Sequence, residues 1–137
     1  MEGLIEGSNG NRPLLIAVTQ LTSTSKEMMN NEQLIPGEVI DSVVNYAKVA
    51  KEAGLDGIVC SPLEVKLVKE VCGKKFITVT PGIRLASNNK DDQVRITTPS
   101  MAREIGSDFI VVGRPITQAE NPVEAYKLIS KEFLGNE

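Results

Sequence analysis

The sequence predicts an α/β fold in which four short parallel strands alternate with helices. Three observations support this prediction. Four apolar runs of strand length recur along the chain, a helical pattern follows each run, and the connections are long enough for right-handed parallel crossovers. The first run, PLLIAVT at 13–19, is apolar on both faces, as a strand covered by helices must be.

The individual elements follow from local patterns. We expect strands at 13–19, 56–60, 75–80 and 107–113. The most regular helix runs from Glu38 to the C-capping Gly54, because its apolar residues recur at helical spacing. Prolines near the first turn predict helices at 62–72, 98–106 and 121–134, and glycine closes the first and the last of these. Thr24 and Glu27 have capping-box spacing and predict a short helix after the first strand.

Two architectures fit four strand–helix units: an open doubly wound sheet, or part of an eight-stranded barrel. The first twelve residues, MEGLIEGSNGNR, contain one apolar pair before a polar loop, which resembles the last turn of a helix. We therefore expect the chain to begin inside a larger fold, with residues 1–137 forming one domain that supplies about four of eight units, a half barrel.

Composition excludes several classes of function. The net charge of −3 provides no basic field for nucleic acid. The apolar runs are too short to span a bilayer, so we predict a cytoplasmic protein with no membrane partner. There is no histidine, and Cys60 and Cys72 are the only cysteines, so we expect buried reduced thiols and no metal site. Acid–base chemistry would have to use Lys, Asp, Glu or Tyr.

Ligands of parallel α/β folds bind at the carboxyl ends of the strands. Two of the four strands deliver an arginine there: Arg84, which follows the third strand in VTPGIR, and Arg114, which follows Gly113 in VVGRPI. A glycine lets an anion approach the backbone, and the planar guanidinium group suits phosphate oxygens. A plain turn with a solvated arginine is the alternative interpretation.

Two further polar residues lie beyond strand ends. Gln93 is in an irregular loop at 81–95, and its amide could bridge a phosphate and a polar ring. That loop is long for a simple connection, which favours a binding loop. Thr22 follows the first strand, where a role in a turn or a helix cap is as compatible with the sequence as contact with a ligand. Glu64 and Lys66 fit a pattern of surface charges.

Taken together, these motifs resemble one known family. The segments LIAVTQLTSTS, AGLDGIVCSPLE, VTPGIR, DDQVRITTPSMAREIGSDFIVVGRPIT and NPVEAY closely resemble the second half of bacterial orotidine 5'-phosphate decarboxylase, over nearly the whole chain. The resemblance implies a (β/α)8 barrel and a homodimer. It also implies conversion of orotidine 5'-phosphate to uridine monophosphate (UMP) and CO2, as a step in pyrimidine biosynthesis, with no cofactor or metal.

The resemblance also implies roles for individual residues. Thr22 would contact the pyrimidine ring, and Pro81 would form part of the apolar wall near the reacting group. Arg84 would belong to the substrate-binding loop, Gln93 would link base and phosphate, and Gly113 with Arg114 would hold the phosphate.

One departure from the family pattern concerns the chemistry itself. The family uses an Asp/Lys array that includes an Asp-x-Lys-x-x-Asp segment, and these 137 residues contain no such segment. We therefore expect no catalytic residue in this chain, which would be a nucleotide-binding half that is inactive alone and needs a complementing N-terminal half. The alternatives are a fragment of another phosphate-binding barrel enzyme, such as a sugar-phosphate decarboxylase or isomerase relative, and a non-catalytic phosphate-binding α/β module.

Overall fold

The computed structural model describes residues 2–8, 10–85 and 97–135. Its centre is a parallel sheet of four strands in the order β1-β2-β3-β4. The strands are β1 (Ile16–Val18), β2 (Gly57–Val59), β3 (Ile77–Thr80) and β4 (Phe109–Ile110). Each strand pairs with its neighbour in sequence, as in a (β/α)8 barrel, whereas a doubly wound sheet reverses its order at a switch point. The order therefore favours the barrel.

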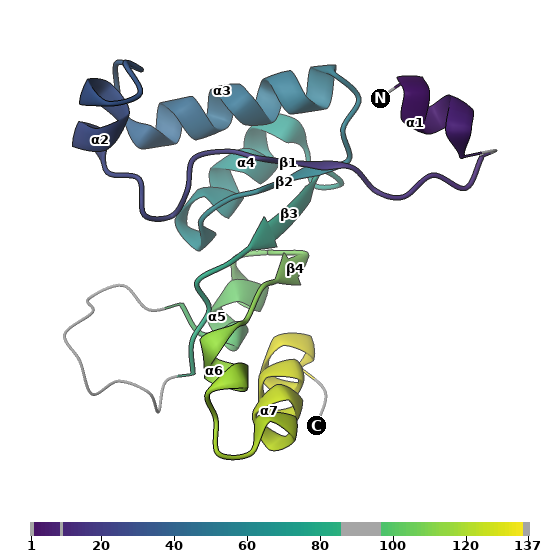
Figure 1. Cartoon of the computed structure of the whole chain (residues 1–137), viewed down its shortest axis with the longest axis vertical. Helices are drawn as coiled ribbons and strands as arrows, with labels where there is room; N and C mark the ends of the chain where they lie inside the picture. The colour runs from purple at the N-terminus through teal and green to yellow at the C-terminus, as the bar shows by residue number, and fades with distance from the viewer. Residues whose placement is uncertain (1, 9, 86–96, 136–137) are drawn as a thin grey trace.

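Helices and turns fill the connections, as Figure 1 shows. They are α1 (Glu2–Gly7), α2 (Lys26–Asn31), α3 (Val39–Glu52), the 3₁₀ turn η1 (Pro62–Glu64), α4 (Val65–Cys72), α5 (Pro99–Glu104), α6 (Arg114–Thr117) and α7 (Pro122–Leu134). The described helices include none that is long and apolar enough to cross a membrane.

The main core lies between β2 and the helices α3 and α4. Its buried side chains come from all three elements, together with residues that flank them: Val43, Ala47, Ala50, Ile58, Cys60, Val65, Val68, Cys72 and Phe76. This arrangement confirms the apolar stripe predicted for α3 and the burial predicted for both free thiols. A second packing contact joins α5 to α7, where Ala102 and Ile129 are buried.

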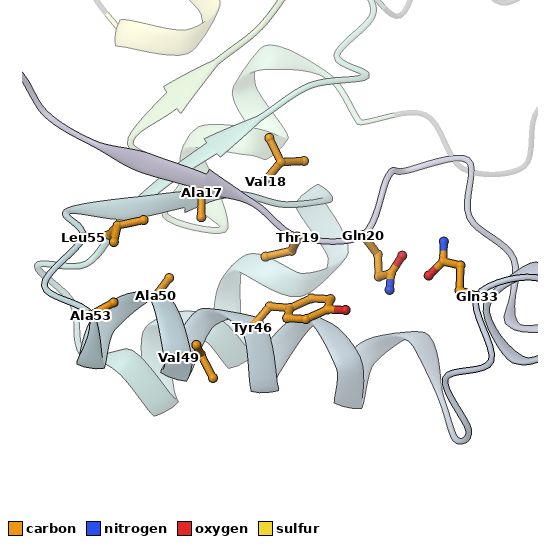
Figure 2. A pocket seen from close by; sticks show the side chains of 10 residues that line it. All are labelled: Ala17, Val18, Thr19, Gln20, Gln33, Tyr46, Val49, Ala50, Ala53 and Leu55. Atoms are coloured by element: carbon orange, nitrogen blue, oxygen red, sulfur yellow. The ribbon is translucent and has the colours of Figure 1, made fainter. Parts of the chain in front are cut away.

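The opposite face of the sheet carries no helix of the described chain. The strand register aligns Val18, Val59, Val79 and Phe109 in one row across all four strands. Val18 is 61% exposed and Phe109 is 52% exposed. Figure 2 shows Ala17 directed toward α3 and Val18 directed away from it, as the alternation of a strand requires. The sheet thus presents an apolar face to solvent.

Three local expectations are wrong. Ser25, and not Thr24, caps α2, because its side chain accepts a hydrogen bond from the Met28 N–H. The strands are shorter than the apolar runs that predicted them, and β4 contains two residues. Glu64 is not a surface charge: its carboxylate accepts a hydrogen bond from the Ser61 N–H at 2.7 Å and completes a capping box.

Candidate functional site

The carboxyl ends of β3 and β4 lie side by side. The backbone N–H of Val111 donates to the Thr80 carbonyl at 2.9 Å, which continues the β3–β4 ladder to the last residue of β3. The segments that leave the two strands, Pro81–Arg84 and Gly113–Arg114, therefore begin next to each other. Adjacent strand ends are where ligands of parallel α/β folds bind.

A hollow of about 660 Å³ opens between these two segments. Its lining includes Pro81, Arg84, Gly113 and Arg114, four of the six residues that the sequence singled out. Cavities of several hundred Å³ are the size that small ligands occupy. The fold therefore brings these four predicted residues to one place.

The hollow has a positive and partly apolar lining. Arg84 and Arg114 contribute guanidinium groups, whereas the described lining residues include no carboxylate. In the described parts of the chain, neither arginine forms an ion pair. Pro81 and Val111 add apolar surface. A charged oxyanion at one end and an apolar body beside it would match this lining.

The backbone of the site is fixed by specific contacts. Gly82 has a φ of +82°, a conformation that suits glycine in the turn after β3. Beyond it, the Arg84 N–H donates to the Thr97 carbonyl at 3.1 Å, and Ile83 forms an isolated parallel bridge with Thr97. Ile83 is 2% exposed, so Arg84 is attached to a buried and paired segment.

Gly113 provides room for an anion near the backbone. A Cβ atom added at this position would meet no atom within 4 Å. The glycine is therefore not required by packing inside the described chain. It leads into α6, a four-residue helix that the sequence patterns did not predict, and Gln118 at the end of α6 also lines the hollow. No sequence signal pointed to Gln118, because α6 is too short for a periodic pattern.

Of the two remaining predicted residues, Thr22 does not line this hollow. Thr22 is exposed in the turn after β1, where the Thr24 N–H donates to the Leu21 carbonyl, and β1 lies at the opposite edge of the sheet from β4. Gln93 lies outside the described residues. Their contacts with a ligand stay predictions.

A second hollow of about 530 Å³ lies between β1 and α3. Figure 2 shows the side chains of Gln20, Gln33 and Tyr46 at one end of it. The Gln20 amide donates to the Ser42 hydroxyl at 3.1 Å. Its described lining contains no charged residue and none of the six predicted site residues, so we assign the candidate site to the hollow that contains both arginines.

Glu64 lies beyond the carboxyl end of β2, and its ionisation is perturbed. Burial raises its pKa, and the hydrogen bond from the Ser61 N–H opposes that rise. Its place in a capping box indicates that it holds the turn after β2. The spacing of Ser61 and Glu64 in SPLE was the signal that could have identified this role.

The described residues contain no group of three His, Cys, Asp or Glu side chains that could hold a metal ion.

Comparison with known proteins agrees with this geometry. A family model described as "Orotidine 5'-phosphate decarboxylase / HUMPS family" matches residues 1–129. Orotidine 5'-phosphate decarboxylase of Bacillus mycoides (strain KBAB4) is 58% identical over 98% of this chain, and the match covers 58% of that relative. The Bacillus anthracis (strain A0248) enzyme has the same identity and coverage. The chain thus spans less than two thirds of the length of these relatives.

Solved structures give the same result. The crystal structure of orotidine 5'-phosphate decarboxylase from Lactobacillus acidophilus matches 96% of this chain and 55% of its own, with a TM-score of 0.81 and 48% identity. The Pyrococcus horikoshii OT3 enzyme matches 90% of this chain and 52% of its own, with a TM-score of 0.65, and at 22% identity it shows the shared fold. The predicted fold class, an α/β fold of the (β/α)8 barrel family, is confirmed, and the four parallel strands are consistent with a half barrel.

Proposed function

Because the chain belongs to the orotidine 5'-phosphate decarboxylase / HUMPS family, we propose that it forms the nucleotide-binding part of an orotidine 5'-phosphate decarboxylase. Such an enzyme converts orotidine 5'-phosphate to UMP and CO2. The observation that carries the proposal is that Arg84 and Arg114, which follow different strands, line one hollow together with Gly113. A nucleotide phosphate is the anion that this arrangement would bind.

The proposed mode of binding assigns each part of the nucleotide to one part of the site. The phosphate lies against Gly113 and the Arg114 guanidinium, where the backbone is open and the charge is positive. The pyrimidine lies beside Pro81, with Thr22 as its polar contact on the β1 side. Gln93 would join base and phosphate. Arg84 would belong to the substrate-binding loop.

The phosphate is remote from the carbon that reacts, yet its binding affects turnover. Interaction energy at a remote group can be used to orient and desolvate the reacting centre, so loss of the phosphate contact lowers kcat as well as affinity. In the reaction, the bond between the ring carbon and the carboxylate breaks, and a proton takes its place. A proton donor must therefore stand beside that carbon.

We propose that this donor comes from outside the present 137 residues. The Asp-x-Lys-x-x-Asp segment characteristic of the family's array is absent from this sequence. In the described chain β1 and β4 are the edge strands of the sheet, and these edges are suited to receive further parallel strands, which would complete a barrel. The chain alone is then inactive, and a complementing N-terminal half restores activity.

Complementation tests this proposal. The 137-residue chain would be combined with the N-terminal part of the Bacillus mycoides relative, and the loss of orotidine 5'-phosphate would be followed by absorbance. We expect decarboxylation by the mixture and none by either part alone. A mixture that contains the Arg114→Ala chain should decarboxylate the substrate much more slowly. Lys127→Ala, a change at a side chain that is 65% exposed, should give the same rate as the unmodified chain. A properly folded but inactive mixture would refute the proposal.

Two further expectations belong to the same proposal. The completed enzyme is expected to form a homodimer, which light scattering of the complemented protein would test: a mass of one barrel would contradict it. Its expected location is the cytoplasm, which cell fractionation would test.

A further inference from the structure

The relative position of β3 and β4 decides the geometry of the hollow. One wall begins at Pro81 after β3, and the facing wall begins at Gly113 after β4. The ladder between the two strands is short, with register pairs Val79 with Phe109 and Thr80 with Ile110. Because this ladder is so short, additional contacts are needed to fix the position of one strand along the other.

Two buried hydroxyl groups supply such a contact. Thr80 is fully buried and Ser107 is 8% exposed. Their oxygens lie 2.7 Å apart, and both also approach the Phe109 carbonyl, Ser107 at 2.9 Å and Thr80 at 3.3 Å. Thr80 is the last residue of β3, directly before Pro81, whereas Phe109 is the first residue of β4 and Ser107 precedes that strand.

The number of available protons determines which hydroxyl donates in the Thr80–Ser107 hydrogen bond. Each hydroxyl carries one proton, and a carbonyl can only accept. The Ser107 hydroxyl donates to the Phe109 carbonyl over the shorter distance, so the Thr80 hydroxyl donates to the Ser107 oxygen. Thr80 is therefore the donor of the hydroxyl bond between β3 and the segment that enters β4, and removal of its hydroxyl breaks this bond while the Ser107–Phe109 bond survives.

We infer that Thr80 is a positioning residue for nucleotide binding: its buried hydroxyl bond to Ser107 sets the separation of the Pro81–Arg84 and Gly113–Arg114 walls. Thr80 does not line the hollow itself, so it acts through the residues that follow it. The inference rests on the proposed function, because it takes the hollow to be the phosphate site. A displacement of one wall against the other would weaken the contacts of a phosphate more than those of the nucleoside body.

The test measures the phosphate advantage, defined as the ratio of the dissociation constants of uridine and UMP for the 137-residue chain. Thr80→Val keeps the shape and removes the hydroxyl, and it should reduce the phosphate advantage by about tenfold, the equivalent of one hydrogen bond. Thr80→Ser keeps the hydroxyl and should restore most of it. The double variant Thr80→Val/Ser107→Ala should lose no more of the phosphate advantage than Thr80→Val does, because Thr80→Val already breaks the bond that the two hydroxyls share.

Thr19→Val is the matched control. The Thr19 hydroxyl donates to the Val59 carbonyl at 2.9 Å, so the same substitution removes a similar bond between β1 and β2. Neither Arg84 nor Arg114 comes directly after these two strands. It should leave the phosphate advantage unchanged. Thermal unfolding of each variant establishes that binding is compared between folded proteins, and Ser107→Ala replaces Thr80→Val if the latter does not fold.

The outcomes separate the two proposals. If the unmodified chain binds UMP no better than uridine, the proposed phosphate site is wrong and the inference falls with it. If the unmodified chain prefers UMP and Thr80→Val keeps that preference, or if Thr80→Ser is as impaired as Thr80→Val, the role of Thr80 is wrong while the phosphate site stands.

Discussion

Arg12 binds Asp56 through two parallel hydrogen bonds, each 2.6 Å long, between residues 44 positions apart in the chain. Asp56 also accepts a hydrogen bond from the Leu15 N–H at 2.8 Å. One carboxylate therefore ties the segment before β1 to the residue that precedes β2. Charge-assisted paired bonds of this kind define geometry as well as contributing energy.

The Asp56 clamp predicts how stability depends on pH. The hydrogen bonds from Arg12, followed by that from the Leu15 N–H, lower the pKa of Asp56 to about 2, whereas an unfolded aspartate has a pKa of about 3.9. Because the folded pKa is the lower one, the stabilisation is complete above the unfolded value and is lost as pH falls toward 2. We expect Asp56→Asn to unfold several degrees lower than the unmodified chain at pH 7, and the difference to shrink on acidification. A difference that stays constant down to pH 2 would contradict the prediction.

Two glycines give a matched pair of predictions. A Cβ atom at Gly57 would lie 2.3 Å from the Ile77 carbonyl oxygen across the β2–β3 seam, whereas a Cβ atom at Gly113 would meet nothing within 4 Å. Gly57→Ala should therefore destabilise the fold by about 1–3 kcal/mol through overpacking, as measured by urea unfolding. An unchanged unfolding midpoint would show that the seam can relax.

At Gly113 the same substitution should affect ligand binding and not stability. Gly113→Ala should leave the unfolding midpoint close to that of the unmodified chain, because the described structure has space for the methyl group. It should weaken UMP binding, because that space is where we propose that the phosphate lies. Titration calorimetry with UMP measures the effect, and unchanged affinity would place the phosphate elsewhere.

Arg114→Ala should discriminate between ligands. Removal of a hydrogen bond to a charged group corresponds to about 10- to 100-fold in affinity, so UMP should bind more weakly by that factor. Uridine, which lacks the phosphate, should bind as before. Equal losses for both ligands would show that Arg114 supports the hollow in general and does not hold the anion.

The cysteines predict a chemical protection pattern. Cys60 is 2% exposed, and burial raises its pKa to about 12, with a smaller contribution from Glu64. Burial also raises the pKa of Cys72. Since the thiolate is the reactive form, both residues should resist alkylation in the folded chain at pH 8 and react rapidly in urea. Rapid labelling of the folded chain, measured by mass spectrometry, would contradict the buried core around β2 and α4.

The apolar periodicity of the sequence, together with capping residues, was sufficient to predict the longer helices. The apolar stripe of α3 predicted its buried face, and Asn121, Pro122 and Gly135 predicted the limits of α7. The residue that caps α2 was harder to predict. Thr24 and Ser25 are adjacent and both have a hydroxyl group, and the backbone geometry of the folded loop makes Ser25 the cap. The length of β4 depends on where its partner strand ends, which the apolar run 107–113 does not specify.

The sequence by itself determined which residues could hold an anion, because glycine and arginine directly after a strand have that chemistry wherever the strand lies. Only the tertiary structure decided that Arg84 and Arg114 line the same hollow whereas Thr22 lies at the far edge of the sheet. The physical reason is strand order: parallel pairing of β3 with β4 joins residues that are about thirty positions apart, and no local pattern encodes which strands become neighbours.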